Sequence, residues 1–161
     1  MDEDDRILIG GARVSPFVST IEIARAPDEV YSYVTDPSRF PEWQRDVVSV
    51  RMQGPPLTVG TRYTTVRRIG GSERTMTQEV TEVIAHRSWE ARGVDGPIRP
   101  AASITVEPLD GGTRSRVTFA LDFEGHGIGV PLVPMVRRMA AKGAPLSYRN
   151  LKERLEGRDT S

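Results

Sequence analysis

Hydrophobic and polar residues alternate along much of the chain, in short runs separated by turn sequences such as GPPLTVG, IGGS and LDGG. The clearest run places Val117, Phe119, Leu121 and Phe123 on one face of a strand, because successive side chains of a strand point to opposite sides. Residues 18–23 alternate between two faces and four of the six are β-branched, which predicts a first strand at 17–25. Similar patterns predict six more strands, at 47–52, 61–69, 73–84, 87–93, 98–109 and 113–123.

Between the first two strands the pattern changes to a helical one. Residues 27–34 have Pro27 at the first position, two acids after it and apolar residues spaced three and four apart, which predicts a helix of about two turns. A proline follows Asp36 and ends this helix, because a residue before proline is driven out of the helical region. Asp36 can also cap a second short helix at 37–43, which carries Trp43 near its end.

Residues 130–157 carry the only long helical pattern. Its apolar residues repeat at steps of three, four and seven and continue after a shift in phase; they are Leu132, Met135, Met139, Leu146, Leu151 and Leu155. Pro145 removes a helical hydrogen bond at a cost of about 3 kcal/mol in an ideal helix. We therefore expect a kink near residues 143–145.

This order of elements resembles the helix-grip fold of the START-related SRPBCC superfamily, and within it the polyketide cyclase/dehydrase-like branch. The resemblance covers about residues 17–156 and is carried by the stretches STIEIARAPDEVYSYVTDPSRFPEW, LTVGTRYT, QEVTEVIAHRSWEARG and VEPLDGGTRSRVTFALDFEG. It implies an α+β fold in which a curved seven-stranded antiparallel sheet wraps around a long C-terminal helix, with two short helices after the first strand. The interrupting stretch KGAPLSY and the acidic start of the chain depart from the family pattern.

The resemblance also implies an internal cavity between the sheet and the C-terminal helix that holds a hydrophobic, polyketide-like or lipid-like molecule. Strand parity and the helical stripe then give the candidate ligand-binding residues, which are Tyr63, Arg67, Met76, Gln78, Trp89, Ile104, Phe119, Leu121, Met135 and Met139. Arg67 could hold a carboxylate or phenolate, and Gln78 a carbonyl group. Each apolar member is also explained by a place in the core, so the expectation of a cavity rests on the resemblance.

An alternative hypothesis is a cyclase, aromatase or dehydratase that acts through a few polar cavity residues, with His126, Arg67 and Tyr63 as the first to consider. No catalytic motif is present, so the catalytic residues stay unassigned. His86 lies in a turn and is expected to be exposed, and Trp43 is interpreted as a plug between the short helices and the sheet rather than a gate.

The basic residues of the C-terminal helix raise a further alternative. Glu153 is the only acid among Arg137, Arg138, Lys142, Arg149, Lys152 and Arg154. A solvated helix face is the favoured interpretation, and an approach to anionic lipid is the alternative. A module that binds a partner through such a face or through the sheet is a third hypothesis, for which the sequence shows no large apolar patch.

Length and composition limit the number of domains and the classes of function that remain. The 161 residues suit one domain at 17–156, with a flexible acidic leader at 1–16, a short strand at 7–9 within it, and a flexible tail at 157–161. A net charge of zero argues against nucleic-acid binding, and the absence of cysteine excludes disulfides and thiolate metal sites. Neither a metal nor another cofactor is expected. We also expect no integral membrane association, a cytoplasmic location and a monomer or homodimer.

Overall fold

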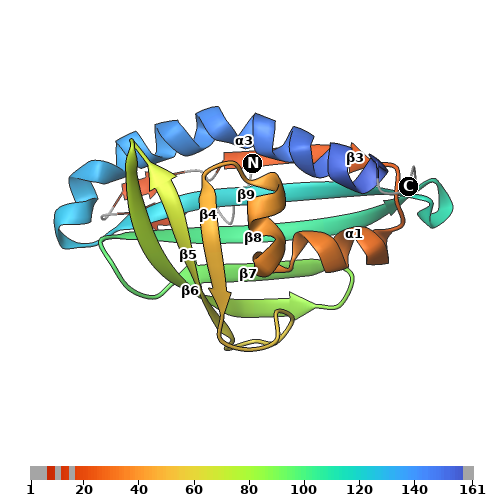
Figure 1. Ribbon diagram of the computed structural model, residues 1–161, viewed down its shortest axis with the longest axis horizontal. Helices are drawn as coiled ribbons and strands as arrows, with labels where there is room; N and C mark the ends of the chain where they lie inside the picture. Colours follow the sequence, from red (N-terminus) through yellow and green to blue (C-terminus); the bar gives the residue numbers. More distant parts are fainter. Residues whose placement is uncertain (1–6, 10–11, 15–16, 158–161) are drawn as a thin grey trace.

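The computed structural model describes residues 7–9, 12–14 and 17–157, and the side chains from residue 17 onward. Within these residues the predicted α+β helix-grip architecture is found: a curved antiparallel sheet, a long helix lying across it, and short helices after the first strand of the sheet (Figure 1). Its strands are β3 (Phe17–Ile23), β4 (Val47–Met52), β5 (Arg62–Ile69), β6 (Ser72–Ile84), β7 (Ser88–Gly93), β8 (Ile98–Leu109) and β9 (Arg114–Gly125).

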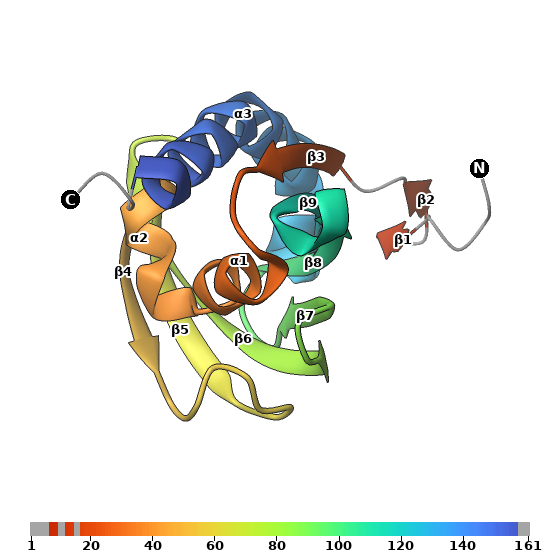
Figure 2. The same cartoon turned by 90° about the vertical axis from the view of Figure 1, so that its right-hand side faces the viewer.

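The seven strands are ordered β3-β9-β8-β7-β6-β5-β4, so β3 and β4 form the two edges. Every neighbouring pair is antiparallel. Figure 2 shows how the sheet curls around the helices. The predicted strand at Ile7–Ile9 is β1, which pairs with β2 (Ala12–Val14) in a separate two-stranded sheet. The flexibility predicted for the rest of the leader and for 158–161 concerns residues outside the described ones.

The short helices form as the sequence predicts. Helix α1 (Pro27–Val34) has Pro27 at its start and ends where the Thr35 hydroxyl donates to the Tyr31 carbonyl over 2.6 Å. The Asp36 carboxylate accepts the Ser38 backbone N–H at 3.1 Å, and so caps η2 (Pro37–Arg39), which runs directly into α2 (Phe40–Trp43). The resulting bend lets α1 and α2 cover one open end of the curved sheet (Figure 2).

Helix α3 (Val133–Gly157) follows η4 (Gly127–Leu132) and differs from the sequence prediction in two ways. It stays helical through Pro145, so the predicted interruption is not found, and Figure 1 shows a bowed helix. Its buried face consists of Val133, Val136, Ser147, Leu151 and Leu155. Leu151 and Leu155 of the expected stripe belong to this face, whereas Met135 and Met139 lie to one side of it and are exposed.

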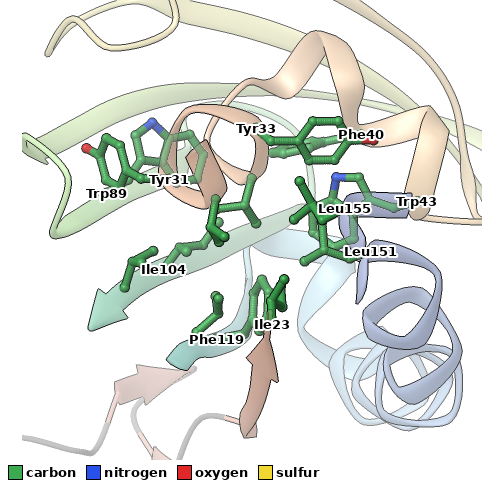
Figure 3. Packing of buried hydrophobic residues seen from close by; sticks show 14 of the residues in the cluster. Ile23, Tyr31, Tyr33, Phe40, Trp43, Trp89, Ile104, Phe119, Leu151 and Leu155 are labelled. Carbon is green, nitrogen blue, oxygen red and sulfur yellow. The ribbon is translucent and has the colours of Figure 1, made fainter. Parts of the chain in front are cut away.

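Two groups of buried side chains hold the fold together. The larger joins α1, α2 and the end of α3 to the sheet and includes Trp43, Trp89, Phe119, Leu151 and Leu155 (Figure 3). The smaller lies under the start of α3 and consists of Ile69, Met76, Ile98, Phe123, Val133 and Val136. A salt bridge between Arg137 and the fully buried Asp122 also ties this part of α3 to β9.

Candidate functional site

A cavity of about 520 Å³ lies between the concave face of the sheet and α3. It is situated between the two core groups and takes lining residues from both. Its apolar and aromatic lining is Phe40, Trp43, Tyr63, Ile69, Trp89, Pro100, Ala102, Ile104, Phe119, Ala120, Leu121, Phe123, Val136, Met139, Ala140, Ala144, Leu146 and Tyr148. The molecule therefore encloses space of the size and character of a small-molecule site.

The cavity exists because side chains that face each other across it are short. Ala102 contributes a single methyl group from β8. On α3 the residues facing it include Ala140, Gly143 and Ala144, which together span one helical turn. Close-packed interiors normally fill such a space with longer side chains. Here the space remains because the walls are held apart by the larger residues at both ends.

A buried network of three polar side chains reaches the cavity wall, which Tyr63 and Gln78 line while Thr65 lies behind them. The Thr65 hydroxyl donates to the Gln78 side-chain carbonyl at 3.1 Å, and the Gln78 amide donates to the Tyr63 hydroxyl oxygen at 3.2 Å. All three residues are almost completely buried. Because Tyr63 accepts in this chain, its own O–H is left to donate, and no acceptor for it is found among the described residues.

Arg67 lies close enough to this network for its positive charge to act on Tyr63. Its guanidinium donates to the Asp46 carboxylate at 2.9 Å, and its side chain is only 17% exposed, whereas the side chain of neighbouring Arg68 is 63% exposed. This difference follows from the pleat, which sends adjacent side chains to opposite faces. Arg67 therefore joins the polar wall to the mouth of the cavity.

Two tyrosines in the wall are strongly affected by burial. Burial raises the pKa of Tyr148 to about 12 and moves the pKa of Tyr63 still further upward, while the nearby charge of Arg67 acts in the opposite direction on both. Both phenols therefore stay protonated even above the pH at which an exposed tyrosine ionises, and both can donate a hydrogen bond. Tyr148 also stacks on Phe119, with 4.1 Å between ring centroids.

The mouth of the cavity opens between α3, the segment after α2 and the end of β5. Its exposed lining residues are Arg45, Asp46, Arg68, Met139 and Gly143. The backbone N–H of Arg68 donates to the Asp46 carbonyl at 2.8 Å, which fixes two sides of the opening to each other. The mouth thus combines charged groups with an apolar side chain from α3.

Eight of the ten predicted ligand-binding residues line this cavity: Tyr63, Arg67, Gln78, Trp89, Ile104, Phe119, Leu121 and Met139. Met76 faces the same side of the sheet but is packed in the smaller core group. Met135 does not line the cavity and is 42% exposed on the outer side of α3. The prediction placed it inward because it took the large apolar residues of the helix to mark the inner face. That any of the eight contacts a ligand stays a prediction.

The structure also gives the positions of three other residues that the sequence analysis considered. His126 lies outside the cavity lining, with its Nε2 2.7 Å from the Glu124 carboxylate, and His86 is exposed in a turn at a positive φ of 63°. Trp43 is 3% exposed and contacts Phe40 and Phe119 edge to face or tilted, which is the junction expected for a plug.

The sequence reasoning missed the small residues of α3 and the segment 44–46. Ala140, Gly143 and Ala144 recur at steps of three and one along the helix, on the same face as Val136 and Ser147. That pattern of small residues was the available signal, but it is weak because alanine is common in any helix. Across the part of the chain that the structure describes, no group of three metal-binding side chains occurs, and no helix is long and apolar enough to cross a membrane.

Comparison with known proteins identifies the kind of domain. A family model described as polyketide cyclase / dehydrase and lipid transport matches residues 16–156. A START superfamily protein from Mycobacterium smegmatis has a similar structure, with a TM-score of 0.71 and 17% identity, covering 88% of this chain and 97% of that one. No curated protein matches the chain in sequence.

Two aromatase/cyclase structures are also similar. The Zhui aromatase/cyclase from Streptomyces sp. R1128 gives a TM-score of 0.71 at 13% identity, covering 88% of this chain and 93% of that one. The di-domain ARO/CYC BexL from the BE-7585A biosynthetic pathway gives 0.64 at 15% identity, covering 87% of this chain and 46% of that one. At such identities the likeness concerns the fold alone.

Proposed function

The chain belongs to the polyketide cyclase / dehydrase and lipid transport family, and on this premise we propose that it binds an amphipathic, largely hydrophobic small molecule in the cavity between the sheet and α3. The observation that carries the proposal is the cavity itself, whose apolar and aromatic walls converge on one polar side made by Arg67, Tyr63 and Gln78. Ligand sites commonly have this composition, with a few polar groups that fix orientation.

The polar groups favour a ligand with an oxygen-bearing, preferably anionic head. Nη1 of Arg67 donates to Asp46, so Nε and Nη2 are left to donate two parallel hydrogen bonds to a carboxylate or to an enolate and its neighbouring oxygen. Tyr63 adds a donor that has no acceptor among the described residues, and Tyr148 adds a second phenol held in its protonated form. A ligand with an apolar body and such a head would satisfy these donors and fill the space left by the small residues of α3.

The proposal is tested by filling the cavity from α3. Ala144→Phe adds a benzyl-sized group to the cavity wall, whereas Ala141→Phe makes the same change at an exposed position of the same helix. We expect an anionic, environment-sensitive fluorophore to bind the unchanged protein and the Ala141→Phe variant alike, and to bind Ala144→Phe at least about tenfold more weakly, a loss of ~1.4 kcal/mol. Equal binding by all three proteins would place the fluorophore elsewhere and contradict the proposal.

A second candidate is a cyclase, aromatase or dehydratase that shapes a reactive chain in the same cavity. It is favoured by Arg67 beside two protonated phenols, because these donors could stabilise negative charge on an enolate oxygen. His126 is not a catalytic residue in this second proposal, because it does not line the cavity. The cavity lining contains one carboxylate, Asp46, and it is paired with Arg67 at the mouth. Binding without transformation is therefore the better-supported function.

A further inference from the structure

One side of the cavity mouth carries an unusual surface, formed by η4 and the outer face of the first half of α3. Four of the nine exposed large apolar residues among the described ones lie here: Ile128, which is 81% exposed, and Val130, Met135 and Met139. Single exposed apolar residues are common, but several that are close together on one surface are typical of an interaction site. We refer to these four residues with Arg138 and Lys142 as the α3 outer surface.

The same surface is positively charged. The sequence contains no acidic residue between Glu124 and Glu153, although the chain as a whole has as many acids as Lys and Arg residues. Arg138 and Lys142 are exposed and four residues apart, so they lie on one side of the helix. Neither makes an ion pair with any residue that the structure describes. Cations left without partners beside protruding apolar side chains favour an anionic, partly apolar surface.

This surface is continuous with the cavity mouth. Met139 is both exposed and part of the cavity lining. Its methyl group lies near the turn between β5 and β6, about 4.0 Å from where a side chain on Gly70 would begin. The acids on the far side of the mouth, Asp46 and Glu73, are each paired with an arginine, Arg67 and Arg68. Their charges are therefore compensated and do not oppose an anionic partner.

We propose that the α3 outer surface docks on the surface of a lipid bilayer that contains anionic phospholipid, with the cavity mouth beside the membrane. Ile128 and Val130 in η4 would enter the boundary between headgroups and acyl chains, while Arg138 and Lys142 face the phosphates. The docking depends only on this surface, but its use in passing an apolar ligand between bilayer and cavity rests on the proposed function. A bilayer accounts for the combination better than nucleic acid, which offers no apolar phase for four exposed aliphatic side chains.

Co-sedimentation with vesicles tests the proposal on the full chain. We expect the protein to pellet with vesicles of phosphatidylcholine containing about one-third phosphatidylglycerol, to pellet weakly with phosphatidylcholine alone, and to be released as salt rises. Each cation near an anionic leaflet contributes about fivefold in affinity, so Arg138→Gln with Lys142→Gln should weaken binding roughly 25-fold. Ile128→Asp should reduce the bound fraction to that seen with phosphatidylcholine alone.

Matched control variants distinguish binding through this surface from nonspecific adsorption of the protein to vesicles. Val59→Asp alters another exposed apolar loop residue, 59% exposed, at the opposite end of β5 from the mouth. Arg51→Gln with Arg87→Gln removes two exposed cations from elsewhere on the protein. Both controls should bind anionic vesicles as well as the unchanged protein does.

Each outcome decides the proposal. Loss of vesicle binding in Ile128→Asp and in the Arg138/Lys142 double variant, with the controls unchanged, supports it. No preference for anionic vesicles, or equal losses in the controls, would overturn it, and specific binding of an acidic protein in place of vesicles would reassign the surface to a protein partner. Fluorophore binding in the cavity, measured on the same variants without vesicles, should be unchanged. Vesicle binding without fluorophore binding would contradict the proposed function and leave the docking surface standing.

Discussion

Individual residues divide the cavity into an apolar body and a polar side. Arg67 is the residue on which this division depends most, because its guanidinium is largely shielded from water while Arg68 beside it is exposed. A hydrogen bond to a charged group contributes about 1.5–3 kcal/mol to the free energy of binding. The head group of a ligand should therefore be recognised mainly through this one side chain.

Replacement of Arg67 tests which head group is recognised. Arg67→Gln should weaken the binding of a fatty acid by roughly tenfold or more, while it should change the binding of the alcohol of equal chain length by much less. Arg51→Gln, on the exposed side of β4, serves as the charge control. Isothermal titration with both ligands gives the comparison. An equal loss for acid and alcohol would show that Arg67 supports the cavity shape rather than the head group.

The burial of Tyr148 predicts how the free energy of unfolding changes at alkaline pH. Burial raises its pKa from 10.0 to about 12, so the unfolded chain loses this proton at a lower pH than the folded protein does. The associated stability is complete below pH 10 and is lost as the pH rises toward about 12; roughly 1 kcal/mol should be gone by pH 11. Urea unfolding at pH 9 and pH 11 should show a smaller decrease for Tyr148→Phe than for the unchanged protein. An identical decrease would mean that Tyr148 ionises normally.

Among the elements, α3 has the most unusual composition. It remains helical although Pro145 cannot donate a hydrogen bond to the Ala141 carbonyl. The helix tolerates this because Leu151 and Leu155 anchor one half in the larger core group, while Val133, Val136 and the Arg137–Asp122 salt bridge anchor the other. Tertiary packing therefore outweighs the local preference of the proline.

Replacement of this proline should consequently stabilise the fold. Pro145→Ala restores a backbone donor at an exposed position and should raise the free energy of unfolding by about 1–2 kcal/mol, after the greater entropy of the unfolded chain is subtracted. Pro134→Ala is the control. Pro134 lies in the first turn of α3, where a backbone N–H has no acceptor within the helix, so the added donor should contribute little. Chemical unfolding measures both. A destabilised Pro145→Ala variant would mean that the proline sets a curvature on which the packing depends.

The elements also show how far the sequence alone could go. The strands and the two short helices were predictable to within a few residues, because alternation, turn residues and the proline after Asp36 act locally. Parity then placed Tyr63, Gln78 and Phe119 correctly on the inner face. The face of α3 was not predictable, because Met135 and Met139 form a regular apolar stripe that packs against nothing in the core. Only the assembled structure shows that the small residues face inward.

The whole molecule surrounds a cavity with two separate groups of core residues. The two core groups lie at either side of the cavity, so the sheet and α3 are held apart without support from the residues between them. The mouth opens next to the cationic and apolar α3 outer surface. On this account the cavity holds a ligand and the outer surface positions the mouth where apolar ligands are found.

The most direct test of this account is a crystal structure of the protein soaked with a medium-chain fatty acid. We expect the acyl chain between β8 and α3, against Ile104, Phe119 and Ala144, with the carboxylate within hydrogen-bonding distance of Arg67. A cavity collapsed by side chains, or a fatty acid bound only outside it, would contradict the account.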